Sequence, residues 1–194
     1  MPAVFLVKPG SIKRDGSGRI LDARSSVAII ASGQKRIIVD SGANDEEEVI
    51  RREMDRIGID PEEISILINT HSHPDHCGNN HLFSRARVLR AKDGVVIAPG
   101  VRIIATPGHS MDSISVVIEV KDAASQELII VISGDALPTF GNFLKNVPPA
   151  LHVDRDQAVA SMQRIVSLSD IVIPGHDFPF SARRREYIPL PFMM

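Results

Sequence analysis

The sequence predicts a layered α/β (α+β) fold in which β-sheets lie between helical layers. Nine short apolar runs rich in β-branched residues are typical of strands, and two longer segments have the periodicity of amphipathic helices. The strands come in groups, with helices between some of them and outside others. This order favours sheets sandwiched between helical layers over a simple alternating parallel sheet.

The expected strands are short, and several are apolar on both faces, which is typical of strands buried between two layers. In chain order they cover residues 3–7, 26–32, 36–42, 64–70, 86–90, 95–98, 101–106, 114–120 and 127–133.

Two segments are expected to be helices, each with an apolar stripe on one face. The first covers residues 45–58, with Asn44 or Asp45 as its N-terminal cap and Gly58 at its end. The second covers residues 154–168. The stripe residues are Val49, Ile50, Met54 and Ile57 in the first helix and Val159, Met162, Ile165 and Val166 in the second.

Length and composition narrow the class of protein. With 194 residues, 43% of them hydrophobic and 24% charged, the chain is predicted to form one globular domain over residues 1–194. Its apolar runs are far shorter than the roughly 20 residues that cross a membrane, and its start lacks the pattern of a signal peptide. The single cysteine, Cys77, excludes an internal disulfide and fits a reducing compartment. We therefore expect a cytoplasmic protein that does not bind membranes.

Four polar motifs each follow an apolar, strand-like run. They are THSHPDH at 70–76, TPGHS at 106–110, SGDA at 133–136 and PGHD at 174–177. Each contains glycine or proline beside the polar residue, as expected where a tight turn brings a side chain to a shared centre. A lone histidine is more often a capping or surface residue. The HxHxDH cluster together with three further motifs, however, predicts a metal centre.

The seven candidate ligands divide into two sets. We predict that His71, His73 and His109 bind one metal, that Asp75, His76 and His176 bind a second, and that Asp135 bridges both. Because His71 and His73 are two residues apart, an extended backbone points them the same way. Imidazole with carboxylate suits zinc, with iron or manganese as alternatives, and open positions beside three protein ligands are typical of a catalytic site.

These motifs resemble the signature of the metallo-β-lactamase superfamily, which is THxHxDH followed by separate His, Asp and His motifs in this order. The resemblance extends from VDSG at 39–42 to PGHDFPF at 174–180. It implies an αβ/βα four-layer sandwich with the metals at one edge between the sheets. It also implies that Asp40 orients a metal ligand, and the alternative for Asp40 is a turn residue before Gly42.

Within the superfamily, the metal motifs are similar to those of glyoxalase II, and the run at 92–119 looks most like the small proteins related to metallo-β-lactamase domain-containing protein one. Asp135 stands where the best-known zinc β-lactamases have cysteine, which disfavours antibiotic hydrolysis. Only 18 residues follow His176. Glutathione recognition by a C-terminal helical domain, as in glyoxalase II, is therefore not expected.

The metal motifs and the resemblance together imply a metal-dependent hydrolase. Two metals roughly 3.5 to 4 Å apart can hold a bridging hydroxide at neutral pH and polarise the oxygen of a carbonyl or phosphoryl group. Asp75 is expected to bind metal, orient the nucleophile and handle its proton. The leading prediction is hydrolysis of an ester, thioester or lactone bond in a small molecule.

Two alternatives stay open. One is cleavage of an RNA phosphodiester, an activity assigned to members of the group that the sequence most resembles. Its candidate phosphate contact is the basic run ARRREY at 182–187, although a net charge of -2 gives no overall positive field. The other is a metal-binding domain without turnover that acts through partners. The apolar tail PLPFMM at 189–194 predicts either packing on its own domain or contact within a homodimer.

The remaining polar residues near the motifs are given structural roles. Cys77 is expected to pack as a small apolar residue, and His81 to lie on a helix surface or cap a helix. The polar residues of 110–113 are expected to organise the turn after the second motif. His152 lies in a loop, where it is either simply exposed or in contact with substrate.

Overall fold

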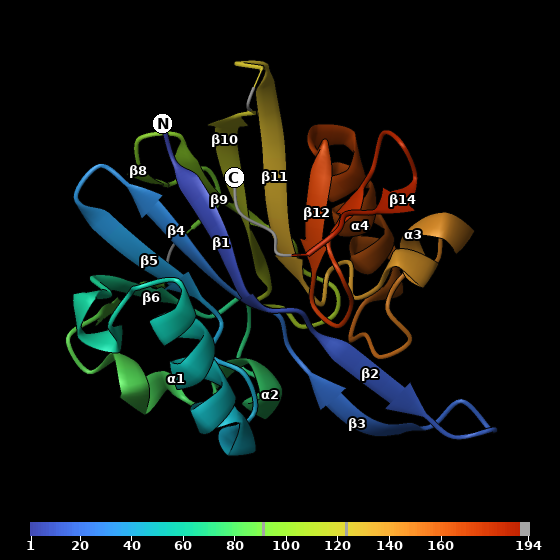
Figure 1. Ribbon diagram of the computed structural model, residues 1–194. Helices are drawn as coiled ribbons and strands as arrows, with labels where there is room; N and C mark the ends of the chain where they lie inside the picture. Colours follow the sequence, from blue (N-terminus) through green and yellow to red (C-terminus); the bar gives the residue numbers. More distant parts are fainter. Residues whose placement is uncertain (91, 123, 191–194) are drawn as a thin grey trace.

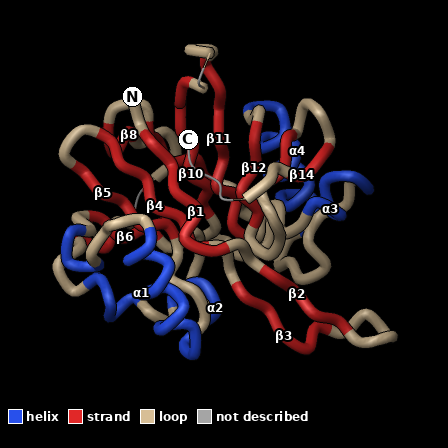
Figure 2. The backbone as a smooth tube through the Cα atoms, viewed as in Figure 1, coloured by secondary structure: helices blue, strands red, loops and turns tan. Residues whose placement is uncertain are grey.

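Two sheets packed face to face form the centre of the molecule, and helices cover their outer faces (Figures 1 and 2). The computed structural model describes residues 1–90, 92–122 and 124–190. In spatial order, the first sheet contains β1 (Ala3–Lys8), β4 (Val27–Ser32), β5 (Lys35–Val39), β6 (Ile66–Ile68) and β7 (Arg87–Val88). The second contains β14 (Glu186–Tyr187), β13 (Phe180–Ser181), β12 (Ile171–Pro174), β11 (Glu127–Gly134), β10 (Ile114–Lys121), β9 (Val101–Ala105) and β8 (Val96–Ala98).

A separate hairpin and two helical layers complete the fold. The hairpin of β2 (Ser11–Arg14) and β3 (Ile20–Arg24) projects away from both sheets (Figure 1). The helices are α1 (Glu47–Arg56) on the side of the first sheet, α3 (Phe140–Lys145) and α4 (Arg155–Leu168) on the side of the second, and the short α2 (Pro74–Cys77). Single 3-10 turns are η1 (Asn44–Glu46), η2 (Pro61–Glu63) and η3 (Asn80–Phe83).

Three layers of apolar side chains hold these elements together. Because side chains alternate along a strand, Ile30 and Ile37 point between the two sheets, whereas Ile29 and Ile38 point toward α1. A third layer joins the outer face of the second sheet to α3 and α4 and includes Val117. Full burial of each such side chain stabilises the fold by about 1.5–3 kcal/mol. The order helix, sheet, sheet, helix confirms the predicted four-layer sandwich.

All nine expected strands are present, with ends that shift by up to a few residues. The strand expected at 36–42 stops at Val39 because Asp40 has a φ of 60° and turns the chain. The strand expected at 64–70 is paired only over 66–68. Both antiparallel and parallel pairs occur, so the sheets are not the simple alternating parallel sheet that the strand order disfavoured.

The predicted cap of the first helix is wrong. The chain enters through the turn η1, and neither Asn44 nor Asp45 caps it; instead the Glu46 carboxylate accepts the N–H of Ala43 at 2.9 Å. The helix ends just before Gly58, which has a φ of 70° as expected for a helix terminator. The second helix begins as predicted.

Several elements were not predicted, namely β2, β3, β13, β14, α2, α3 and the 3-10 turns, and the apolar run before His176 forms β12. The turn of the β2–β3 hairpin does have a recognisable sequence, in which aspartate is followed by glycine and serine. The Asp15 carboxylate accepts the N–H groups of Ser17 and Arg19 and so closes the turn DGSG.

None of the helices in the described ranges is long and apolar enough to cross a membrane. Of the apolar tail at 189–194, residues 191–194 lie outside the described residues, so the homodimer contact stays a prediction.

We expect Ile37→Ala to lower the free energy of unfolding by roughly 2–5 kcal/mol, because the fully buried side chain would leave a cavity between the two sheets. Urea denaturation would measure the change. Val96→Ala is the matched control: Val96 is 69% exposed, and its replacement should change stability by less than about 0.5 kcal/mol. An equal loss of stability in the two variants would contradict the placement of Ile37 in the core between the sheets.

Candidate metal centre

The four polar motifs meet at one edge of the two sheets. β9 and β11 both pair antiparallel with β10, and β12 pairs parallel with β11, so β9, β11 and β12 end at the same edge. The end of β6 joins them, because Ile114 at the start of β10 donates its N–H to the carbonyl oxygen of Thr70 at 2.8 Å. On the other side, the N–H of Ser26 donates to the carbonyl oxygen of Gly175 at 2.7 Å. The residues that follow these four strands are therefore neighbours.

One group of side-chain atoms that could hold a metal ion comes from His71, His73, His109 and Asp135, and these atoms all lie within 4.8 Å of one another. Nε2 of His71 and Nε2 of His109 lie 2.9 and 3.0 Å from Nδ1 of His73. Oδ2 of Asp135 lies 3.4 Å from Nε2 of His109. His71 and His73 point to one centre, as their spacing predicted.

The second group contains Asp75, His76 and His176, again within 4.8 Å. Oδ2 of Asp75 lies 3.5 Å from Nε2 of His176 and 3.9 Å from Nε2 of His76. Oδ1 of Asp135 lies 3.3 Å from Nε2 of His76 and 3.1 Å from Nε2 of His176. The structure therefore brings together all seven residues that the sequence predicted as metal ligands. Asp135 lies between the two groups.

In His109 and His176, a hydrogen bond at Nδ1 orients the ring so that Nε2 points toward the other candidate ligands. Nδ1 of His109 lies 2.7 Å from the carbonyl oxygen of Leu151, and Nδ1 of His176 lies 2.9 Å from the carbonyl oxygen of Arg24. Because a carbonyl oxygen only accepts, each Nδ1 carries the proton and each Nε2 presents its lone pair. Partners of this kind orient metal-binding histidines. The sequence carried no signal for them, since any residue supplies a backbone carbonyl.

Asp40 fixes the ring of His76 in the same way. Its Oδ2 lies 2.8 Å from Nδ1 of His76, and its Oδ1 accepts the N–H of Thr70 at 2.7 Å. The residue is 2% exposed and adopts the left-handed conformation, which is uncommon for residues other than glycine but tolerated by aspartate. Asp40 therefore holds His76 and also forms the turn before Gly42, so the two interpretations of this residue are compatible.

Burial and neighbouring charges set the protonation of the side chains. Burial lowers the pKa of His71 to about 2, so its ring is neutral near neutral pH. Burial also opposes a charge on His76, but the carboxylates of Asp40 and Asp135 outweigh it and raise the pKa well above its ordinary value. Likewise, burial opposes the charge on Asp135, but His76 and His176 hold its pKa well below the ordinary range. The site thus keeps a charged carboxylate among imidazoles, a donor set that binds transition metals.

Two buried atoms at this centre have no hydrogen-bond partner in the part of the chain that the structure describes. They are Nε2 of His76 and Oδ1 of Asp135. An unsatisfied buried polar atom costs roughly 1–3 kcal/mol. A divalent cation between the two groups would satisfy both atoms, so these residues fit a metal.

Glycine is required beside the site because backbone and carboxylate approach closely. A Cβ on Gly175 would lie 2.2 Å from Oδ1 of Asp135, and a Cβ on Gly134 would lie 2.5 Å from Oγ1 of Thr70. Both contacts are too short for carbon and oxygen. The glycines of the third and fourth motifs thus serve close packing.

A pocket of about 160 Å³ opens over the two groups, with residues of both in its floor. Its walls come from the β2–β3 hairpin, from the segment before α4 and from Pro138 before α3. The wall residues are Ile12, Arg14, Ile20, Ala23, Pro138, Pro149, Ala150 and Leu151, all apolar except Arg14. The sequence did not identify them, because, apart from Pro138, they lie far from the motifs along the chain.

Cys77 and His81 lie outside both groups. Sγ of Cys77 donates to the carbonyl oxygen of His73 at 3.2 Å, and the side chain is partly buried. His81 is exposed and lies 3.1 Å from a carboxylate oxygen of Glu47 in α1, which confirms its surface role.

The polar residues after the second motif organise their turn as predicted. Oγ of Ser110 donates to Oδ1 of Asp112 at 2.6 Å, and the N–H of Ser110 donates to Oγ of Ser113 at 3.2 Å. His152 is exposed, and its Nδ1 lies 2.8 Å from the carbonyl oxygen of Pro149. It does not line the pocket over the metal-binding groups.

Comparisons with known proteins agree with this architecture. A model of the Metallo-beta-lactamase superfamily matches residues 21–92. A probable metallo-hydrolase of Methanocaldococcus jannaschii is 35% identical over 152 residues, covering 73% of this chain and 70% of that protein. Metallo-beta-lactamase domain-containing protein 1 of Mus musculus is 28% identical, covering 93% and 75%. A solved N-acyl homoserine lactone hydrolase, with N-hexanoyl-L-homoserine at its catalytic metal centre, has a TM-score of 0.73 at 20% identity, covering 99% and 98%.

The fold and the clustered His and Asp side chains are those of a metal-dependent hydrolase. The chain belongs to the metallo-β-lactamase superfamily. This confirms the resemblance seen in the sequence motifs.

We expect Asp40→Asn to weaken metal binding by roughly 10–100-fold, because an amide cannot hold the Nδ1–H of His76 as a carboxylate does. Competition with a chromogenic chelator would measure the affinity. Asp93→Asn, which changes an exposed carboxylate paired with Arg164, is the matched control and should bind metal like the wild type. Equal metal affinity of both variants would show that Asp40 does not orient the site.

Proposed function

We propose that the protein is a binuclear metal-dependent hydrolase, with zinc in both positions, that acts on an ester, thioester or lactone bond in a small molecule. The observation that carries the proposal is the pair of ligand groups with Asp135 between them, placed at the floor of a pocket. His71, His73 and His109 would hold one ion, Asp75, His76 and His176 the other, and Asp135 both. Iron or manganese are the alternatives to zinc for the same donor set.

When bound, two such ions supply Lewis acidity and lower the pKa of water to about 7, so that a nucleophile is available at neutral pH. The protein's own residues determine orientation and proton transfer. Asp75 is suited to the second task because it belongs to the second ligand group and also lines the pocket. Its carboxylate can accept a proton from the nucleophile and return it to the leaving group.

The walls of the pocket support a substrate with an apolar portion. Ile12 and Ile20 from the hairpin face the pocket together with Pro149 and Leu151. Arg14 is the basic residue of the wall. A relative of the same fold holds N-hexanoyl-L-homoserine at its catalytic metal centre, which combines an apolar acyl chain with a carboxylate. An acyl lactone is therefore the first substrate to try.

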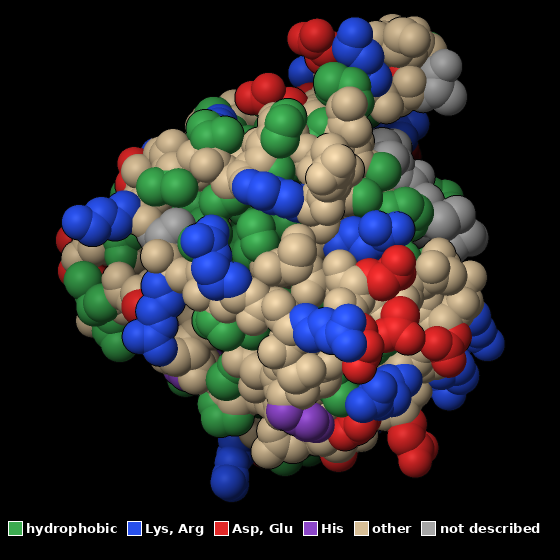
Figure 3. All heavy atoms as spheres, turned by 90° about the vertical axis from the view of Figure 1, so that its left-hand side faces the viewer, with side chains coloured by type: hydrophobic (Ala, Val, Ile, Leu, Met, Phe, Trp, Pro, Cys, Tyr) green, Lys and Arg blue, Asp and Glu red, His purple; other side chains and the backbone are tan. Residues whose placement is uncertain are grey.

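The basic run at 182–187 gives little support to the RNA alternative. Arg183 pairs with Asp170, Arg184 lies 3.1 Å from Glu186, and the guanidinium of Arg185 lies over the ring of Phe143 at 5.2 Å. These arginines contact their own chain rather than forming a free phosphate-binding surface. On the side of the molecule shown in Figure 3, basic side chains are dispersed among hydrophobic and acidic ones.

We expect Asp75→Asn to retain most of the bound metal while lowering kcat by roughly 10²–10⁴-fold, because the amide cannot take up a proton. Elemental analysis and steady-state kinetics would be measured on the same preparation. Asp93→Asn, a change outside both ligand groups and outside the pocket over them, is the control. Turnover at the wild-type level in Asp75→Asn would remove the proton-transfer role.

The proposed function is tested by metal content and a substrate panel on the full chain. We expect two zinc ions per chain in the wild type and fewer in His71→Ala, with hydrolysis of an acyl lactone, an acyl thioester or an aryl ester. Cleavage of a bis-aryl phosphodiester alone would favour the nuclease. Bound metal without turnover on any substrate would favour a metal-binding domain that acts through partners.

A further inference from the structure

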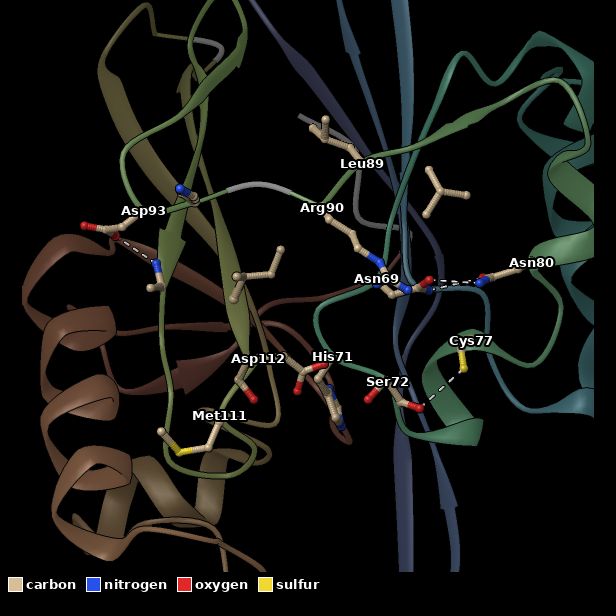
Figure 4. Close-up of a pocket in the computed structure, with 15 residues that line it drawn as sticks. Asn69, His71, Ser72, Cys77, Asn80, Leu89, Arg90, Asp93, Met111 and Asp112 are labelled. Atoms are coloured by element: carbon tan, nitrogen blue, oxygen red, sulfur yellow. Dashed lines mark hydrogen bonds between the residues drawn. The ribbon is translucent and has the colours of Figure 1, made fainter.

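A second and larger pocket lies between the two sheets, beside the loop that follows β6. Its volume is about 630 Å³, within the range of about 300–1,000 Å³ that is typical of small-molecule sites. It is bounded by the ends of β6 and β9, the start of β10 and the segment after β7 (Figure 4). Of the seven metal-centre residues, only His71 lies in its wall, so it is distinct from the pocket over the metal-binding groups.

Part of the wall is apolar and unusually exposed. Leu89 and Ile114 line the pocket together with Val88, which is 56% exposed, and Met111, which is 63% exposed. Clustered exposed apolar side chains in a concave site are typical of a ligand-binding surface. The occupant is therefore expected to have an apolar body.

The acidic residues of the wall are already engaged by the chain. Asp93 accepts the N–H of Ala105 at 2.8 Å and pairs with Arg164 at 2.9 Å. Asp112 accepts the hydroxyl of Ser110 at 2.6 Å, and this hydrogen bond lowers the pKa of Asp112. The charge of Asp93 is thus compensated by Arg164, whereas Asp112 keeps its negative charge and is stabilised by a hydrogen bond.

The basic residues of the wall are not compensated in this way. Within the described residues, neither Arg90 nor Lys92 makes a side-chain hydrogen bond or an ion pair. Arg90 extends toward Asn69, whose amide pairs with that of Asn80 through bonds of 3.2 and 2.9 Å (Figure 4). The pocket therefore places an unpaired guanidinium above a polar amide pair and next to apolar side chains.

We propose that this pocket binds a small organic anion with an apolar chain, its acidic group on Arg90 and its chain against Leu89, Ile114 and Met111. A guanidinium presents several N–H donors in one plane and binds carboxylate-like groups through paired hydrogen bonds. The apolar residues cover the chain of the ligand. This site does not depend on the proposed hydrolytic function.

The site also lies against the loop that carries the metal-centre residues. The amide of Asn69 donates to the carbonyl oxygen of His76 at 3.0 Å, and Ser72 and Cys77 line the same wall. The two pockets are therefore on different sides of one loop. Binding in the second pocket must be separated experimentally from binding to the metals.

Calorimetric titration of the metal-loaded full chain with hexanesulfonate makes this separation, because a sulfonate pairs with a guanidinium but is a weak metal ligand. We expect one binding site per chain in the wild type, and at least tenfold weaker binding of the uncharged hexanamide. Arg90→Gln should weaken hexanesulfonate binding at least tenfold. Val88→Asp, at an exposed position that tolerates substitution, should do the same by adding a like charge to the wall.

Two arginine variants, Arg87→Gln and Arg14→Gln, are the matched controls. Arg87 lies in β7, three residues before Arg90 and outside the pocket wall, and Arg14 lies in the wall of the pocket over the metal-binding groups. Both should bind hexanesulfonate like the wild type. The proposal is overturned if the wild type shows no saturable binding at millimolar ligand, if Arg90→Gln binds normally, or if Arg14→Gln alone loses binding.

Discussion

The packing of the two sheets against each other is the constraint on which the rest of the structure depends. Isoleucine and valine side chains from both sheets fill the space between them and are almost wholly excluded from water. This burial fixes how the end of β6 lies relative to the ends of β9, β11 and β12. The loops after these strands then have little freedom, and their polar side chains converge. A rigid apolar layer thus positions groups that would otherwise repel one another or remain hydrated.

Bringing these polar side chains together in a buried place has an electrostatic cost, and neighbouring side chains offset it. Asp135 is only 8% exposed. Burying its carboxylate is unfavourable unless neighbouring charges or hydrogen bonds compensate for the lost hydration. Around Asp135 the imidazoles of His76 and His176 supply that compensation, and Asp40 holds His76 from behind. A metal ion bound between these side chains would supply positive charge to Asp135 in the same place. The arrangement is therefore coherent as a cation site and costly as a purely structural cluster.

The two pockets divide the surroundings of the metal-centre loop into different chemical environments. The smaller pocket has the metal-binding groups as its floor and mostly apolar walls from the hairpin and the segment before α4. The larger one has exposed apolar side chains and contacts the other side of the loop. Its Arg90 has no ion-pair partner among the described residues. Of the acidic residues of its wall, Asp93 is paired with Arg164 and Asp112 is hydrogen-bonded to Ser110, so the two basic residues Arg90 and Lys92 leave an excess of positive charge that suits the proposed anion.

The sequence by itself predicted the layered fold class, the nine strands that it named and the seven residues that the structure brings together as a candidate metal centre. Strands buried on both faces and histidines placed after them leave local patterns that can be read without a structure. The tertiary structure alone decided what surrounds those residues. The carbonyl groups of Arg24 and Leu151, the apolar wall of the hairpin and the pairing of Asn69 with Asn80 join segments far apart in the chain. Backbone groups and surface side chains of this kind have no characteristic pattern, because their role arises only from which segments the packed sheets bring together.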